Sequence, residues 1–224
     1  MIYAFINPAL LSERPGGAAP LPTPLLREAE WIPVTGWGEE ELLHLPAAFT
    51  SWLVLHHGAV VITPDGQEDP AWSRLTLETQ RSAELALNLA FQAARHIGAL
   101  RQLGTEVALV ERHGSPLLVQ ITHPYHLRQA TEEAARELAE WIEESPFSTQ
   151  LRLGWEGETL YLLPRELDKA SAVNYVLSHL DPAAELTVGV GRHEEDGAFL
   201  ALCDYALIPG EELTETLNRS EDPE

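Results

Sequence analysis

The sequence has few basic residues and almost no cysteine. Its 224 residues include 14 Lys or Arg against 35 Asp or Glu, which gives a formal net charge of −21 at pH 7. A field of that sign repels nucleic acid and anionic membrane surfaces, so we expect neither as a partner. The single cysteine, Cys203, excludes an intramolecular disulfide and fits a reducing compartment. It lies in the apolar run FLALC, which favours packing over a nucleophilic role.

Long apolar runs are also missing. No stretch approaches the ~20 apolar residues of a membrane span. The N-terminal segment MIYAFINPALL lacks the basic region and the small-residue cleavage site of a signal peptide. Hydrophobic residues (45%) and charged residues (22%) nevertheless stand at ordinary globular values, so the chain can bury a core. We therefore expect a folded, acidic, cytoplasmic protein.

The motifs of several common chemistries are incomplete. Gly189-Val190-Gly191 follows an apolar run, but Glu194 stands where a dinucleotide-binding motif needs its third glycine. The close histidine pairs, at 56–57 and 123/126, have no third ligand at zinc-like spacing. No G-x-S-x-G motif is present, which argues against a serine hydrolase of that type.

Apolar segments at both ends of the chain predict short buried strands. Before residue 64 they are residues 2–6, 31–35 and 52–62, and residues 13–24 predict a loop because they hold four prolines and two glycines. A short helix is predicted at 39–45. Near the end we expect helices at 169–180 and 197–203, strands at 186–190 and 205–208, and a frayed tail at 218–224.

The middle of the sequence has a different pattern. Residues 75–103 predict a long helix whose apolar residues Leu85, Leu89 and Ala93 share one face. A second helix is predicted at 131–144 with Thr131 as its N-cap. Hairpins are predicted at 106–111 with 117–122, and at 150–155 with 159–163 around the turn Glu156-Gly157. Two α/β stretches therefore flank an α+β insert, which favours one parallel sheet interrupted by a second module.

Several segments resemble motifs of one superfamily. They are Thr35 in VTGW, the HGA step at residues 57–59, Asp168-Lys169-Ala170 before a helix, and GVGRHEEDGAFLALCDYALIP at residues 189–209. Together they resemble the haloacid-dehalogenase (HAD) superfamily of phosphatases, in particular the C2-capped branch with sucrose-phosphatase-like and Cof-like sugar phosphatases. The resemblance covers nearly the whole chain. It implies an α/β fold with a HAD-like Rossmannoid core, a parallel sheet flanked by helices, at 1–64 plus 159–224 and an inserted α+β C2-type cap at 65–158.

Phosphatases of this superfamily need four parts. An aspartate after the first strand attacks phosphorus, and a second aspartate two residues later acts as acid and base. A Thr or Ser and a Lys hold the phosphoryl oxygens, and late carboxylates complete a Mg²⁺ site. By resemblance, Thr35 and Lys169 match the phosphate-binding positions, and Asp196 matches the second late acidic position.

The other positions depart from the pattern. Aligning Leu10-Leu11 with the end of the first motif puts Phe5 at the nucleophile and Asn7 at the acid/base, and neither side chain can do that work. Arg192 stands where the first late metal ligand belongs, so we expect no catalytic residue and no metal, with Asp196 a remnant of the metal site. Thr35, Lys169 and Arg192 then remain either as a metal-free anion site or as a closed site, with Arg192 bridging to Asp196 and Phe5 on the pocket floor.

These departures predict a pseudophosphatase, a non-catalytic binding or regulatory protein without a cofactor whose partner is another protein or a small anionic ligand. One alternative is an active Mg²⁺-dependent phosphatase of sugar phosphates or related small phosphomonoesters that uses Asp65 or Asp196 as its nucleophile. Another is an acidic module that recruits a basic partner in a salt-dependent way. The sequence does not indicate an oligomeric state.

Overall fold

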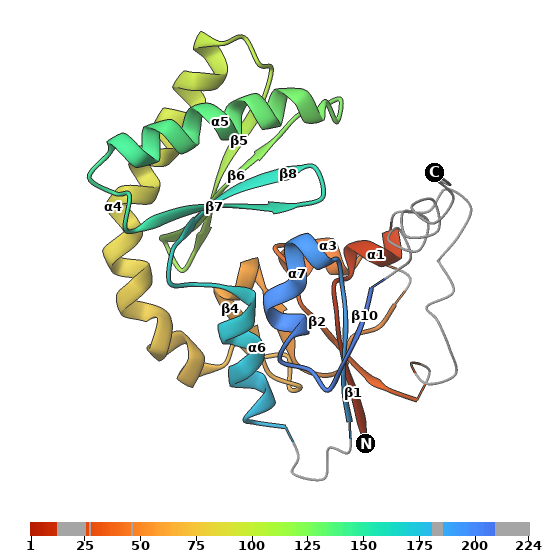
Figure 1. The fold of residues 1–224 in the computed structure, drawn as a ribbon. Helices are drawn as coiled ribbons and strands as arrows, with labels where there is room; N and C mark the ends of the chain where they lie inside the picture. The colour runs from red at the N-terminus through yellow and green to blue at the C-terminus, as the bar shows by residue number, and fades with distance from the viewer. Residues whose placement is uncertain (13–25, 27, 46, 181–185, 209–224) are drawn as a thin grey trace, which may run out of the picture.

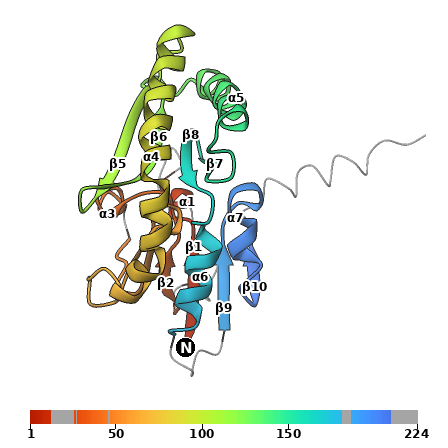
Figure 2. The ribbon, with the colours of Figure 1, turned by 90° about the vertical axis from the view of Figure 1, so that its left-hand side faces the viewer.

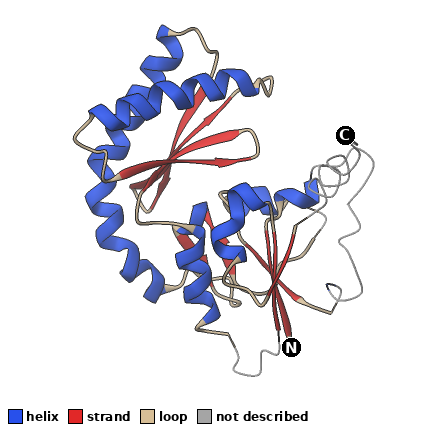
Figure 3. Ribbon diagram, in the orientation of Figure 1, coloured by secondary structure: helices blue, strands red, loops and turns tan. Residues whose placement is uncertain are grey.

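The computed structural model describes residues 1–12, 26, 28–45, 47–180 and 186–208, and the side chains of residues 12 and 193–195 are not described. The predicted loop at 13–24 and the predicted tail lie outside these residues. Figure 3 shows two layered α/β modules, one above the other. No helix in the described part of the chain is long and apolar enough to cross a membrane.

The lower module contains a four-stranded sheet built from both ends of the chain. Its order is β10-β9-β1-β2 and all its neighbours are parallel. The strands are β1 (Ile2–Ile6), β2 (Glu30–Pro33), β9 (Leu186–Val190) and β10 (Tyr205–Leu207). Helices α6 (Lys169–Leu177) and α7 (His193–Leu200) pack on one face through a buried apolar cluster (Figure 2). The predicted parallel sheet, flanked by helices, is confirmed.

The third apolar segment differs from its prediction. It forms an antiparallel pair, β3 (Leu53–Leu55) with β4 (Val60–Ile62), in place of another parallel strand. The chain reverses in the 3-10 turn η1 (His56–Gly58), where His56, His57 and Gly58 have φ of 50°, 56° and 92°. An isolated bridge between Val34 and Val54 connects this pair to the end of β2.

The upper module, the cap, is an antiparallel sheet of order β5-β6-β8-β7 covered by two helices (Figure 1). The expected boundary after residue 158 falls inside this sheet, because β8 pairs with both β6 and β7. The antiparallel sheet therefore continues to Pro164. Its elements are α4 (Pro70–Leu100), β5 (Glu106–Arg112), β6 (Ser115–Thr122), α5 (Arg128–Glu144), β7 (Leu151–Glu156) and β8 (Thr159–Pro164).

Two details of the cap helices correct the sequence prediction. Helix α4 turns its alanine-rich face, with Ala83, Leu87 and Ala90, to the sheet, whereas Leu85 and Leu89 are 64% and 37% exposed. Small side chains let the helix approach the sheet closely, and this decides which face is buried. Helix α5 begins at Arg128, and the Thr131 hydroxyl donates to the Arg128 carbonyl instead of capping the helix.

An apolar seam joins the cap to the core. In it Leu55 and Val60 of the core pack with Leu118, Tyr161 and Leu163 of the cap, all at most 2% exposed. Two further short helices belong to the core, α1 (Ala9–Ser12) and α3 (Glu39–Leu42). The seam seats the β7–β8 hairpin over the carboxyl end of the parallel sheet, where the site lies.

Candidate functional site

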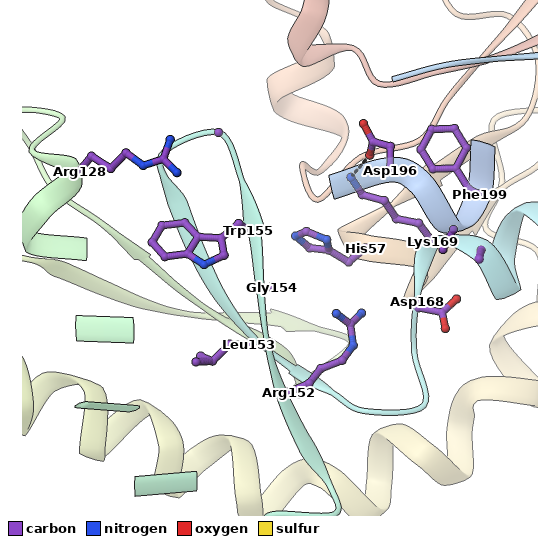
Figure 4. A pocket seen from close by; sticks show the side chains of 13 residues that line it. His57, Arg128, Arg152, Leu153, Gly154, Trp155, Asp168, Lys169, Asp196 and Phe199 are labelled. Carbon is purple, nitrogen blue, oxygen red and sulfur yellow. Dashed lines mark hydrogen bonds and ion pairs between the residues drawn. The ribbon is translucent and has the colours of Figure 1, made fainter. Parts of the chain in front are cut away.

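A cavity of about 400 Å³ lies between the β7–β8 hairpin of the cap and helices α6 and α7 of the core. Arg128, Arg152 and Trp155 line it from the cap, and His57 and Lys169 line it from the core (Figure 4). Of the five charged side chains that line the cavity, three are cationic (Arg128, Arg152 and Lys169) and two are anionic (Asp168 and Asp196). The lining is therefore richer in cations than the chain as a whole, whose formal net charge is −21.

Lys169 is the most enclosed cation of the site. It opens α6 just after the N-cap Asp168, whose carboxylate accepts a hydrogen bond from the Ser171 amide at 2.6 Å. Its Nζ lies 3.0 Å from Asp196 Oδ1 and 3.2 Å from Glu156 Oε2. Burial alone lowers the pKa of Lys169, but the two carboxylates outweigh this effect and raise the pKa above its ordinary value. The side chain is therefore a charged ammonium group in the folded protein.

Asp196, on α7, is held by three donors. Besides Lys169, its Oδ2 accepts from Asn7 Nδ2 at 2.8 Å and from the Arg192 backbone amide at 2.9 Å. A Cβ added at Gly191 would lie 2.8 Å from Asp196 Oδ2, so a side chain there would collide with the carboxylate. The closed-site interpretation expected Arg192 to bridge to Asp196, and the structure pairs the Asp196 carboxylate with the Lys169 ammonium group.

Glu156, at the tip of the cap hairpin, is the second carboxylate on Lys169. Its side chain is 1% exposed although it ends a strand at a turn. Oε1 accepts a hydrogen bond from Thr35 Oγ1 at 2.5 Å, and Oε2 accepts one from the Gly36 backbone amide. Donors from the end of β2 and the start of α6 thus converge on one carboxylate of the cap.

His57 borders the same carboxylate. Its Nε2 is 3.9 Å from Glu156 Oε2 and has no hydrogen-bond partner among the described residues, and its ring makes an edge contact with Tyr161. Burial lowers the pKa of His57 well below its ordinary value, and the charges of Lys169 and Arg152 lower it further. The imidazole is therefore neutral near pH 7, so the contact with Glu156 is not an ion pair.

The residues singled out from the sequence separate into two groups. Thr35, Lys169, Asp196 and Asn7 meet in one buried polar network, with Glu156 between the first two. Phe5 is 0% exposed in the apolar cluster under α6 and α7 and is not among the residues that line the cavity. Asn7 is thus the side chain that the end of β1 contributes to the network.

The remaining candidates lie apart from the cavity or meet it through the backbone. The Arg192 backbone contacts Asp196 twice: its amide donates to the Asp196 carboxylate, and its carbonyl accepts from the Asp196 amide. Asp65 lies in an exposed turn after β4 and does not line the cavity. Burial raises the pKa of the Cys203 thiol to about 12, so it is protonated at neutral pH and a poor nucleophile.

Mg²⁺, the cofactor that the fold suggests, does not fit the described side chains. The ammonium group of Lys169 and the amide N–H of Asn7 both point at Asp196, where a cation would need free oxygens. No group of three or more His, Cys, Asp or Glu side chains among the described residues could share a metal ion.

Sequence motifs predict no role in the site for three of its residues, although His57 belongs to the HGA step at residues 57–59. Glu156 belongs to an Asp- or Glu-Gly turn of the kind that is normally exposed, so its sequence position predicts a solvated side chain. His57 and Arg152 are brought to the cavity by the η1 turn and by β7. Long-range packing, which no local pattern reports, places all three.

Comparisons with known proteins now define the fold. No family model matches the sequence, and no curated protein matches it. Solved structures do match. The trehalose-6-phosphate phosphatase C-terminal domain of C. albicans is 13% identical with a TM-score of 0.57, and the match covers 99% of this chain and 77% of that chain. The sucrose-phosphatase of Synechocystis is 13% identical with a TM-score of 0.51, and the match covers 99% of this chain and 88% of that chain. An IMP-nucleotidase of Plasmodium falciparum is 10% identical with a TM-score of 0.59, and the match covers 96% of this chain and 66% of that chain. The chain has the HAD-like fold, a Rossmannoid core with a cap.

Proposed function

We propose that this chain is a catalytically degenerate HAD-fold protein, a pseudophosphatase that acts by binding. The observation that carries the proposal is the network around Lys169, which is complete without metal or substrate. Lys169 meets two carboxylates, and Asp196 meets three donors. Buried polar groups with every partner in place hold a fold together, and a phosphoryl-transfer site would instead keep groups free for its substrate.

The end of β1 supports the same conclusion. At the expected acid/base position an aspartate would carry a negative charge and exchange a proton, whereas the Asn7 carboxamide has neither a negative charge nor a titratable proton. Its Oδ1 accepts from the Ala9 backbone amide at 3.0 Å, and its Nδ2 donates to Asp196. Asn7 therefore acts as a structural crosslink between β1 and α7.

The rival is a Mg²⁺-dependent phosphatase with a displaced nucleophile, and the phosphatases among the structural neighbours favour it. Of its two candidate nucleophiles, Asp65 is exposed outside the cavity, and both carboxylate oxygens of Asp196 are engaged. Neither candidate presents a free carboxylate to the cavity, so the binding function is the better supported. Its partner is a protein or a small anionic ligand, and the three cations that line the cavity beside Asp168 and Asp196 support the second of these.

Hydrolysis of sugar phosphates and p-nitrophenyl phosphate with Mg²⁺ tests the proposal. We expect no turnover by the wild type. The variants Asn7→Asp and Asn7→Asp/Arg192→Asp restore carboxylates at the network, while Phe5→Asp is the contrasting change because it buries a charge in the apolar cluster and should fail to fold. Turnover by the wild type that a chelator abolishes would overturn the proposal in favour of the rival.

A further inference from the structure

Glu156 occupies a set of donors that suits an oxyanion. Its two oxygens take a hydroxyl from Thr35, a backbone amide from Gly36 and an ammonium group from Lys169. These donors come from the core, while Glu156 comes from the cap. We propose that Glu156 is an internal ligand of this site, a tethered carboxylate that keeps out free phosphate-class oxyanions and that such an anion must displace in order to bind.

The close approach of the hairpin to the core supports this inference. A Cβ at Gly36 would lie 2.6 Å from Glu156 Oε2 and 2.2 Å from His57 Nε2, so the carboxylate reaches the amide only because residue 36 has no side chain. Gly157, directly after Glu156, has φ of 59° and nothing within 4 Å of an added Cβ. The hairpin tip is thus tight on the core side and open on the other side.

The unpartnered imidazole is a second, independent observation. His57 is 5% exposed and lines the cavity, and its Nε2, next to the Glu156 carboxylate, has no hydrogen-bond partner within the part of the chain that the structure describes. A buried polar atom without a partner is costly, and a site that binds a ligand can supply the missing partner. An oxyanion larger than a carboxylate has further oxygens that can accept from an Nε2–H in the required tautomer.

Displacement does not require the cap to swing open. The apolar seam of Leu55, Val60, Leu118, Tyr161 and Leu163 keeps the modules together, and the adjoining cavity of about 400 Å³ has room for a displaced side chain. A ligand tethered to the protein acts at an effective concentration of roughly millimolar or more. Free phosphate therefore meets strong competition in the wild type and little competition once the carboxylate is removed.

Titration of the full-length protein with inorganic phosphate, without Mg²⁺, tests the inference by calorimetry and by the phosphate-dependent shift of the melting temperature. Glu156→Ala removes the carboxylate, and Glu156→Gln keeps the shape without the charge. We expect both variants to bind phosphate at least about tenfold more tightly than the wild type, a loss of competition worth about 1.4 kcal/mol. Glu156→Ala/Lys169→Met should lose the gained binding.

Glu158→Gln is the matched control, since Glu158 lies on the same hairpin but is 49% exposed and pairs with His126 at 3.0 Å. It should bind phosphate as the wild type does. A folded Glu156→Ala that binds no phosphate, or a wild type that binds as tightly as Glu156→Ala, overturns the inference. Should Glu156→Ala fail to fold, Glu156→Gln decides by the same two criteria. The inference rests on the proposed binding function, but its readout is affinity without turnover, so the two can fail separately.

Discussion

Two buried clusters join the cap to the core, and they differ in kind. The apolar seam, in which Leu55 and Val60 meet Leu118 and Tyr161, needs only shape and apolar surface. The polar network, in which Glu156 meets Thr35 and Lys169, needs every donor matched to an acceptor. We expect volume-conserving changes in the seam to cost little stability and the loss of a charged partner from the network to cost more. Within one interface, the apolar seam therefore holds the two modules together, and the polar network requires particular side chains to meet.

The largest expected effect breaks the network at its cation. Lys169→Met leaves the buried carboxylates of Glu156 and Asp196 without their shared ammonium group, and we expect a loss of about 3–5 kcal/mol in the free energy of unfolding. Urea denaturation at pH 7.5 measures it. Lys169→Met/Glu156→Gln/Asp196→Asn, which removes the stranded charges as well, should recover part of the loss. No recovery would contradict the electrostatic explanation.

The apolar seam gives the matched comparison. Leu118, 0% exposed, packs between the modules, and Leu118→Ala should cost about 2–5 kcal/mol through lost transfer energy and a residual cavity. Phosphate affinity in a Glu156→Gln background should not change, because no donor of the site is touched. Leu118→Met, which conserves volume, should cost less than about 1.5 kcal/mol. A large change in phosphate affinity in either variant would show that the seam and the network are coupled.

Acid sensitivity separates the clusters further. The pKa of His57 is lowered in the folded protein, so the unfolded chain binds a proton that the folded chain does not bind. The contribution of neutral His57 to the free energy of unfolding is therefore fully present above pH 6.5, the ordinary pKa. It is lost as the pH falls from 6.5 toward the pKa of His57 in the folded protein. The expected slope is about 1.4 kcal/mol per pH unit below pH 6.5.

His57→Gln should remove this slope, as measured by urea denaturation between pH 4.5 and 8. His56→Gln is the neighbouring control: burial lowers the pKa of His56 as well, but less strongly, so its removal should flatten the profile less. Equal flattening by the two variants would argue against a special position for His57 beside Glu156.

The sequence predicts the backbone of the core better than its chemistry. Residues 2–6 and 186–190 are short apolar runs ended by turn residues, and both form strands as predicted. Lys169 and Asp196 both match motif positions in the resemblance, and the structure brings them into contact. Phe5 and Asn7 show where prediction from the sequence fails. The alignment assigns both to catalytic positions by their spacing, but in the folded sheet Phe5 lies in the apolar cluster and only Asn7 contacts the network. Glu156 could not be predicted, because its burial depends on contacts more than a hundred residues away.

Helix α4 carries the smallest expected effect and tests the same limit. Leu85, Leu89 and Ala93 form the apolar face that the sequence pattern makes conspicuous, yet Leu85 is 64% exposed and the helix turns Leu87 and its alanines to the sheet. Leu85→Gln should change the free energy of unfolding by no more than about 0.5 kcal/mol. Leu87→Ala, two residues along on the buried face, should cost about 2–5 kcal/mol. A larger loss of stability for Leu85→Gln than for Leu87→Ala in urea denaturation would mean that the face with Leu85, Leu89 and Ala93 is the packed side of α4.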